Sequence, residues 1–416
     1  MPRAETNWAG NYTFAAAAVR RPATVEQVRE IVAGARQVHV LGSRHSFHGL
    51  ADAPDLIALD ALPADVVVDP SSRSVSCSAG LTYAALATAL AAPALALPNL
   101  ASHAHFTIAG AVATATHGSG DGSGNLAAAV EGLELMTSDG ELVRASRGDP
   151  DFEGLVVGLG ALGAVTRVTL DVEPAYEVRQ RVFEGLAWDA FLDRFDQVMG
   201  AGTSVSVFTS WDDPIEQVWV KSRVTDAPEE VRGDLFGAAA ATVQRHPVLG
   251  VDPVDSTPQL GQPGPWFDRL PHFRAGFRPP AGDELQSEYV VPRRHGREAL
   301  AAVRRLAGVI RPVLHVAEIR TVAADRLWLS PQYEEDTIAL HFSWTPDQAA
   351  VERVLVGLEA ALAPFRARPH WGKLFLAGAP ELARLYERLP DFRRLAERLD
   401  PRGAFRNPWL DTHVLG

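Results

Sequence analysis

The chain has 416 residues, 47% hydrophobic and 22% charged, which is typical of a globular enzyme but too large for one compact core, so we expect two domains. Its formal net charge is −12 without any basic run, which argues against nucleic acid or an anionic membrane as a partner. The single cysteine, Cys77, excludes a disulfide framework and a thiolate metal cluster.

The pattern of apolar and turn-forming residues over 1–173 predicts short helices and strands joined by loops. Thr24 and Gln27 have the spacing of a capping box, and apolar residues then recur at helical intervals. Two short runs with strand character flank the turn 70–73. The expected elements are a helix at 24–35, a strand at 37–41, a hairpin at 65–69 and 74–79, a helix at 82–91 and strands at 130–137 and 164–172.

Residues 108–125 consist mainly of Gly, Ala, Ser and Thr. Such a stretch can be a flexible linker. Here it lies between apolar segments and precedes a predicted strand, so we interpret it as a loop packed close to a ligand, where small residues let the backbone approach.

After Pro174 the sequence contains more tryptophan, longer amphipathic helices and separate strands. This alternation predicts an α+β domain with a mainly antiparallel sheet flanked by helices. The segment 252–271 is rich in Pro and Gly, and we expect a long surface excursion there. The expected elements are strands at 204–209, 216–221, 286–291, 315–320 and 337–344, and helices at 297–310, 346–362 and 379–399.

One segment, 158–163, matches the Gly-x-Gly-x-x-Gly dinucleotide fingerprint. A Rossmann site requires this loop to begin a helix, so that the pyrophosphate meets the helix N-terminus. The residues that follow, 164–170, alternate as a β-strand instead. We therefore reject a Rossmann site at this position.

The strand-to-loop segment 40–47 has a clearer functional pattern. A strand followed by Gly42, Ser43 and Arg44 presents consecutive backbone N–H groups, which suits a phosphate. Arg44 either adds charge to that cradle or is a solvated loop residue. His45 is either a hydrogen-bonding loop residue or a point of attachment, because an imidazole nitrogen can bond to the methyl group of a flavin.

Three histidines, His103, His105 and His117, lie in or near a polar stretch and could in principle bind a metal. Metal sites usually add carboxylate or cysteine ligands at recognisable spacing, and none stands beside these histidines. We therefore expect no metal. The hydroxyl groups of this region are better suited to hydrogen-bonding a cofactor: Ser102, Thr107, Thr114 and Thr116.

Charged residues interrupt one strand of the second half. Leu314, Val316, Glu318 and Arg320 are expected on one strand face, because alternate residues point the same way. The face thus changes from apolar to two opposite charges. Such a pair is either a surface ion pair or part of a pocket.

Two further polar positions occur in apolar surroundings. His341 and Ser343 share one face of another predicted strand, opposite two aromatic residues. A lysine is normally solvated, but Lys373 is flanked by Trp371 and Phe375, which favours a position in a pocket. Only the combination of these features is specific.

Together these residues resemble the alditol (xylitol) oxidases of bacteria, within the flavoprotein family named after vanillyl-alcohol oxidase. The resemblance spans nearly the whole chain in separated blocks, and the ending 400–407 is similar to that of aldonolactone oxidases. The other blocks are 6–11 (TNWAGN), the His45 loop, 97–102 (LPNLAS), 112–120, 286–289 (QSEY), 318–325 (EIRTVAAD) and 368–373 (RPHWGK).

The resemblance implies a two-part FAD-binding domain of the vanillyl-alcohol-oxidase type, formed by both chain ends, with a cap domain between them. The implied boundaries are 1–173 for the FAD-binding domain, 174–375 for the cap and 376–416 for the returning segment. It also implies that FAD is covalently bound through His45. The residues implied to contact FAD are Leu41, Gly42, Ser43, Arg44, His45, Ser46, Phe47, Ser102, Thr107, Gly110, Thr114, Ala115, Thr116, His117, Val165 and His370.

The implied substrate is a small polyol such as xylitol, sorbitol or glycerol, oxidised at its terminal primary alcohol to the aldose. Glu318 and Arg320 would hold its first two hydroxyls, and Lys373 would stabilise the developing alkoxide or take up its proton. The hydride would pass to flavin N5, and O2 would be reduced to H2O2. The residues implied to line this pocket are Ser102, Glu318, Arg320, Ser343 and Lys373.

Two positions depart from the family pattern. Arg44 stands where the wider family often has Gly, and Ser343 stands where some relatives have Thr. The second departure removes a methyl group from the expected pocket wall. A second covalent bond to the flavin is not expected, because Cys77 lies outside the loop that would carry it.

Three other functions remain open: an aldonolactone oxidase or dehydrogenase on the same scaffold, a metal-dependent hydrolase that uses the three histidines, and a non-catalytic polyol-binding protein. Residues 1–10 contain no apolar leader, and no apolar stretch has the pattern of a membrane span. We therefore expect a cytoplasmic monomer that acts on a polyol and O2, without a membrane or nucleic-acid partner.

Overall fold

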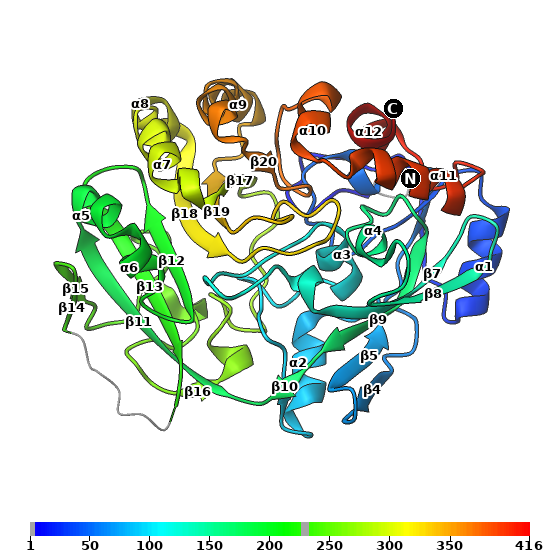
Figure 1. Ribbon diagram of the computed structural model, residues 1–416, viewed down its shortest axis with the longest axis horizontal. Helices are drawn as coiled ribbons and strands as arrows, with labels where there is room; N and C mark the ends of the chain where they lie inside the picture. Colours follow the sequence, from blue (N-terminus) through cyan, green and yellow to red (C-terminus); the bar gives the residue numbers. More distant parts are fainter. Residues whose placement is uncertain (1–4, 226–232) are drawn as a thin grey trace.

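The computed structural model describes residues 5–225 and 233–416. Its elements form two neighbouring halves, each around its own hydrophobic core (Figure 1). We call them the small-sheet half, residues 5–174 with 376–416, and the large-sheet half, residues 175–375. This arrangement confirms the predicted α+β class with a mainly antiparallel sheet in one part.

The small-sheet half contains a five-stranded antiparallel sheet in the order β4-β5-β9-β7-β8. A parallel sheet in the order β1-β3-β2 and the pair β10-β6 complete it. The strands are β1 (Val19–Arg20), β2 (Val38–Val40), β3 (Asp55–Ile57), β4 (Val66–Asp69), β5 (Ser74–Ser78), β6 (Leu95–Ala96), β7 (Val130–Met136), β8 (Leu142–Ser146), β9 (Ala164–Asp171) and β10 (Glu173–Pro174).

Four helices of this half pack on its sheets, and the first begins where the sequence predicts. The Thr24 hydroxyl accepts a hydrogen bond from the backbone N–H of Gln27 at 3.2 Å, which caps α1. The helices are α1 (Val25–Gly34), α2 (Tyr83–Ala91), α3 (Ile108–Ala113) and α4 (Phe152–Val156).

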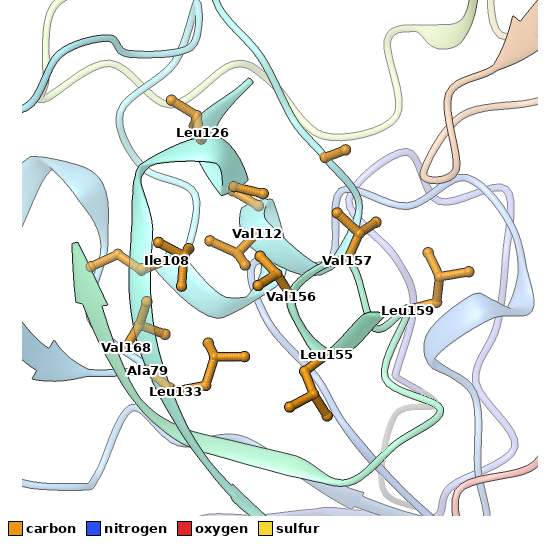
Figure 2. Packing of buried hydrophobic residues seen from close by; sticks show 14 of the residues in the cluster. Ala79, Ile108, Val112, Leu126, Leu133, Leu155, Val156, Val157, Leu159 and Val168 are labelled. Atoms are coloured by element: carbon orange, nitrogen blue, oxygen red, sulfur yellow. The ribbon is translucent and has the colours of Figure 1, made fainter. Parts of the chain in front are cut away.

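Helix α3 corrects the prediction of a loop over 108–125. Ile108 and Val112 are four residues apart, so one face of a helix buries both, and Figure 2 shows them beside Leu133 of β7 and Val168 of β9. The remainder, after α3, is a loop as expected. Because α3 is packed against the sheet, the small residues directly before and after it are held in fixed positions.

The C-terminal helices return to the small-sheet half, on the side that carries α1 (Figure 1). The N–H of Val38 donates to the carbonyl of Ala404 at 2.8 Å, and Asn407 Nδ2 bonds the carbonyls of residues 49, 50 and 52. The helix predicted at 379–399 is divided, because Pro390 is tolerated only in the first turn of a helix. The three helices are α10 (Ala379–Leu385), α11 (Leu389–Leu399) and α12 (Pro408–Leu410).

The large-sheet half is built on one antiparallel sheet of ten strands in the order β14-β15-β11-β13-β12-β18-β19-β17-β20, with β16 beside β11. All strands predicted after residue 200 are present. They are β11 (Glu177–Leu186), β12 (Ser204–Thr209), β13 (Ile215–Arg223), β14 (Asp234–Leu235), β15 (Ala238–Ala240), β16 (Gly264–Pro265), β17 (Leu285–Pro292), β18 (Leu314–Val322), β19 (Thr337–Trp344) and β20 (Arg368–Pro369).

Helices cover one face of this sheet and bury its aromatic residues (Figure 1). The helix predicted at 297–310 is interrupted, since Leu306 donates to the carbonyl of Val303 in a tighter turn. The helices are α5 (Trp188–Asp193), α6 (Phe195–Met199), α7 (Gly296–Arg304), α8 (Ala307–Ile310) and α9 (Gln348–Leu362). No helix among residues 5–225 and 233–416 is long and apolar enough to cross a bilayer.

Two predictions about this half are wrong in detail. The register of β18 against β19 shifts between Leu314 and Val316, so Leu314 packs in the helix-covered core while Val316 faces the other way with Glu318. The Pro- and Gly-rich segment 252–271 is only in part a surface excursion: Val254 and Leu260 are exposed, but Thr257 and Trp266 are almost fully buried. Pro and Gly mark irregular backbone, but they do not say whether that backbone is exposed.

Candidate active site

A cavity of about 910 Å³ lies between the two halves and is lined by residues of both. At one end, which we call the glycine end, small residues and backbone dominate: residues 41–46, 107, 109–114, 116, 158–160, 162 and 163. At the other, the charged end, buried or half-buried ionisable side chains of the large sheet and of the turn after β20 face the space: Glu288, Glu318, Arg320, His341 and Lys373. The two ends have different chemistry.

The glycine end contains a narrow backbone cradle. A Cβ added to Gly42 would lie 2.5 Å from Thr107 Oγ1, and one added to Gly110 would lie 2.8 Å from the same atom. Thr107 Oγ1 is buried without a hydrogen-bond partner. A buried hydroxyl is normally paired, so this atom is available to a polar ligand that enters the cradle. The site therefore fits a ligand that approaches the backbone closely and accepts or donates hydrogen bonds.

The loop of Gly158, Gly160 and Gly163 also lines the glycine end. It follows α4 and leads into β9, so it begins a strand rather than a helix, which confirms that it is not a Rossmann loop. Sequence reasoning nevertheless missed its place in the cavity. The signal was the density of glycine itself, which indicates close backbone approach even where the fingerprint fails.

Arg44 occupies a strained backbone position. Its φ is +65°, in the left-handed region that favours glycine, and its guanidinium contacts the carboxylate of Glu5. The backbone therefore explains why glycine suits this position. Arg44 is half-buried at the cavity wall and pairs with Glu5 rather than standing free as a solvated loop residue.

His45 is held by three aromatic neighbours. Its ring stacks on Trp8 with centroids 4.9 Å apart, lies edge-on to Phe106 at 4.8 Å, and its Nε2 is 2.8 Å from Nε2 of His105. Burial, with a smaller effect of His105, lowers the pKa of His45 to about 3. The imidazole is therefore neutral at physiological pH and keeps a lone pair, which is the nucleophilic form.

The three histidines considered as metal ligands do not converge. His103 stacks on Phe273, His105 bonds His45, and His117 Nε2 lies 2.9 Å from Glu288 Oε1. Within residues 5–225 and 233–416, no group of three or more His, Cys, Asp or Glu side chains is arranged to hold a metal ion. Their surroundings instead link His105 to the His45 loop and His117 to the charged end.

Glu288 is the centre of the charged end. One of its carboxylate oxygens accepts from Arg320 at 2.7 Å and lies 2.9 Å from His117, while the other contacts Lys373 Nζ. Burial opposes ionisation, but the charges of Lys373 and Arg320 outweigh it and hold the pKa of Glu288 well below its usual range. Glu288 is therefore a carboxylate that compensates two buried cations.

Glu318 has a different set of partners. His272 Nε2 lies 2.8 Å from its Oε1, and Arg320 Nε lies 3.6 Å from the same atom. Burial opposes ionisation here too, but Arg320 and His272 outweigh it and hold the pKa of Glu318 well below its usual range. Arg320 Nε is itself buried and makes no hydrogen bond, so it is available to a ligand.

Lys373 is positioned by a turn attached to β17. His370 N donates to the carbonyl of Glu288 at 2.9 Å, and Leu374 N donates to that of Gln286 at 2.8 Å. Lys373 Nζ then contacts Glu288 and lies 2.8 Å from His341 Nδ1. Burial lowers the pKa of Lys373, and Glu288 opposes that shift.

The structure brings nearly all predicted site residues to one cavity, although they come from separate segments. Phe47 and Ala115 are the exceptions: both are buried behind the wall, Phe47 in the core of the large-sheet half. The predicted residues that line the cavity are Leu41, Gly42, Ser43, Arg44, His45, Ser46, Ser102, Thr107, Gly110, Thr114, Thr116, His117, Val165, Glu318, Arg320, Ser343, His370 and Lys373.

Sequence reasoning missed Glu288 and His272 as site residues. Glu288 lies in a strand that is otherwise largely apolar, and an isolated carboxylate in such a strand is a signal that it has a buried partner. His272 follows the segment interpreted as a surface excursion, so nothing indicated that its ring is buried.

Family profiles match both parts of the chain. Residues 16–146 match an FAD binding domain, and residues 283–413 match D-arabinono-1,4-lactone oxidase. The first contains the His45 loop and the rest of the glycine end except the loop 158–163. The second contains the strands and the turn that carry the charged end.

Full-length relatives cover nearly the whole chain. An alditol oxidase of Streptomyces sp. is 49% identical over 415 residues, covering 99% of each sequence. An L-gulono-1,4-lactone dehydrogenase of Mycobacterium tuberculosis is 29% identical and also covers 99% of each. Among solved structures, a cholesterol oxidase from B. sterolicum superposes with a TM-score of 0.79 at 15% identity, covering 98% of this chain and 96% of that chain. That likeness bears on the fold alone.

Proposed function

Since the chain belongs to the alditol oxidase family of FAD-dependent oxidoreductases, we propose that it oxidises the terminal primary alcohol of alditols to the aldose and reduces O2 to H2O2. The observation that carries this proposal is the juxtaposition within one cavity. A glycine-rich backbone cradle with His45 lies at one end, and Glu318, Arg320 and Lys373 lie at the other. The first suits a cofactor and the second suits a small polar substrate.

FAD fits the glycine end, where Gly42 and Gly110 let the backbone pack closely around Thr107, whose hydroxyl has no partner among the described residues. We propose that FAD is bound covalently through His45, whose neutral, aromatic-packed imidazole retains a nucleophilic nitrogen. When bound, FAD supplies the hydride acceptor of the reaction. The residues that we propose to contact FAD are those implied by the family resemblance of the sequence. Phe47 and Ala115 are excepted, because they lie behind the cavity wall.

At the charged end, Arg320 and Glu318 can donate to and accept from neighbouring hydroxyl groups of a polyol. Arg320 has an unpaired buried Nε, and Glu318 is held ionised and therefore accepts. Ser102 and Ser343 line the same cavity and add hydroxyl partners. Several such contacts fix the alcohol carbon in position, which is a large part of the catalytic task.

Lys373 meets the reacting hydroxyl in this proposal. Its contact with the Glu288 carboxylate favours the ammonium form, which stabilises negative charge developing on the alcohol oxygen. Glu288 thus acts through Lys373 and Arg320 and is a positioning residue. We also propose the domain boundaries 1–173, 174–375 and 376–416, because most members of each hydrophobic core come from the segments so delimited, although Trp266, Trp328 and Trp371 of the middle segment pack in the core of the small-sheet half.

Acid precipitation of purified protein tests the flavin assignment. The yellow colour should stay with the pellet in the wild-type protein and be lost with His45→Ala. His413→Ala, a histidine outside the cavity, should behave as the wild type. A colourless wild-type pellet from cells supplied with riboflavin refutes covalent attachment, and a wild-type protein without any flavin refutes the function.

Substrate turnover separates alditol oxidation from lactone oxidation. Oxygen consumption should be rapid with xylitol or sorbitol and slow with gulono- or galactonolactone. A reversed preference would place the activity with the lactone oxidases and dehydrogenases, which are more distant relatives of this chain.

A further inference from the structure

Lysine occurs only twice among the 39 Lys and Arg residues of the chain, at 221 and 373. Both side chains are buried between strands and loops near the charged end, whereas the surface cations are arginines. Lys373 faces the cavity, but Lys221 lies behind its wall on β13. A fully buried lysine costs desolvation energy, so its partners indicate what it does.

The Lys221 ammonium has three acceptors. Its Nζ donates to the carbonyl of Leu270, to that of Pro271 at 3.2 Å and to Nδ1 of His272 at 3.1 Å. Three donors on a compact ammonium are matched by three acceptors, a geometry that the planar guanidinium of arginine would not satisfy. Lys221 is therefore fully paired, and one of its partners is an imidazole.

That imidazole points toward the active site. Since Nδ1 accepts from Lys221, the proton of neutral His272 must sit on Nε2, which then donates to Glu318 Oε1 at 2.8 Å. Phe208 and Trp219 lie edge-on to the ring, each with centroids 5.4 Å from it. The backbone N–H of His272 donates to the carbonyl of Ser102 at 3.0 Å, so one residue joins two segments that line the cavity.

We propose that Lys221 and His272 are positioning residues for alditol oxidation: Lys221 selects the His272 tautomer that donates to Glu318 and so holds this carboxylate ionised and oriented toward the substrate. This inference rests on the proposed function. Without Lys221, the ring can place its proton on Nδ1 and turn a lone pair toward Glu318. The Glu318 carboxylate would then no longer be held in the orientation in which it accepts a hydrogen bond from the polyol.

A double-mutant cycle tests this mechanism, because a glutamine amide carries a fixed donor and needs no tautomer selection. In the wild-type background, Lys221→Met should lower kcat/KM for xylitol about tenfold or more, the size of one lost charge-assisted hydrogen bond. His272→Phe should do the same, and His272→Gln should restore much of the loss. Adding Lys221→Met to His272→Gln should cost less than about threefold.

Readouts other than turnover separate positioning from folding. Stabilisation of the thermal transition by xylitol should weaken in Lys221→Met while flavin absorbance stays unchanged. Thr337→Val, on β19 of the same sheet, removes a buried hydrogen bond to the carbonyl of Val322 away from the cavity and is the matched control. An equal loss in the control, or the same cost of Lys221→Met in both backgrounds, overturns the tautomer mechanism.

The pH profile adds an independent check. The charged groups that face Lys221 are Glu318 and Arg320 of β18, with His272 between them, and burial lowers the pKa of Lys221 to about 7. Activity should therefore decline as the pH rises through that value, and Lys221→Met, which has no titrating group at this position, should lack the decline near this value. If the wild-type enzyme fails to oxidise xylitol, the proposed function fails; if it succeeds and these variants change nothing, only the positioning role fails.

Discussion

The two ends of the cavity are built by opposite means. The glycine end consists mainly of backbone and small side chains from a few continuous loops, with Arg44 paired to Glu5 at its wall and Thr107 as an unpaired polar group among the described residues. The charged end consists of side chains from strands that are far apart in the sequence, such as Glu288 on β17 and Glu318 on β18. Cofactor binding and substrate chemistry are thus separated in space and in the kind of interaction used.

The two ends of the cavity are therefore sensitive to different kinds of mutation. A cradle made of backbone is blocked by a single added methyl group, because there is no room to move. A cluster of buried charges tolerates shape changes better but fails when one charge loses its counter-ion. Mutations at the glycine end should therefore change flavin loading, and mutations at the charged end should change turnover or stability.

The largest effect is expected at Lys373, and it separates the two ends most sharply. Lys373→Ala removes the ammonium that stabilises the alcohol oxygen, so kcat/KM for xylitol should fall by about a hundredfold to a thousandfold. Flavin content, measured by absorbance, should stay at the wild-type level. Turnover close to that of the wild type would remove Lys373 from the mechanism.

Glu288→Gln should affect both activity and stability. The change leaves Lys373 and Arg320 without their shared carboxylate, so the free energy of unfolding should fall by about 3 kcal/mol. Chemical denaturation measures this loss, and kcat should fall with it. Glu335→Gln, which removes a surface ion pair with Arg294, is the control and should cost less than about 1 kcal/mol. Equal losses in both would contradict the role of Glu288.

The pH dependence of Lys373→Arg sharpens the role of the ammonium. Burial lowers the pKa of Lys373, so the ammonium is lost as the pH rises through a value below about 10.4. A group needed in its charged form gives activity below its pKa and loses it above. The residual activity of Lys373→Arg should lack this alkaline decline, because arginine stays charged. Wild-type activity that rises through the same range would make Lys373 the base.

Gly42→Ala tests the glycine end in a His45→Ala background, where FAD binds without a covalent bond. The added Cβ meets Thr107 Oγ1 at 2.5 Å, so FAD affinity should fall about tenfold, as measured by flavin fluorescence. Gly357→Ala, where a Cβ meets nothing within 4 Å, should leave affinity unchanged. A comparable loss in both variants would show that the cradle is not specific.

The smallest effect is expected for Arg44→Gly. Glycine relieves the left-handed backbone at φ +65°, but the contact with Glu5 is lost and the unfolded chain gains freedom. These effects oppose one another, so the free energy of unfolding should change by less than about 1 kcal/mol. Thermal denaturation should show a shift of about 2 °C or less. A large destabilisation would mean that Arg44 has a further partner.

Most regular elements and the His45 loop follow from the sequence alone, whereas helix α3 and the place of the loop 158–163 do not. Periodic apolar residues predict α1 and the strands of the large sheet, because local pattern and burial agree there. The His45 loop could be recognised from the sequence because its functional groups are neighbours in the chain. The family resemblance also assigned the charged residues of β18 and the Lys373 turn to the site, although neither segment alone is specific for this function.

The pairing of the buried charged side chains follows from the tertiary structure and cannot be predicted from local sequence. Glu288 and Lys373 are 85 residues apart, and His272 reaches Glu318 across 46 residues, through contacts that no local pattern encodes. The bulge before Val316 and the partial burial of the 252–271 segment likewise depend on what packs against them. Sequence periodicity reports which face of an element is apolar, whereas the partner of a buried charge is chosen by the packing of distant segments.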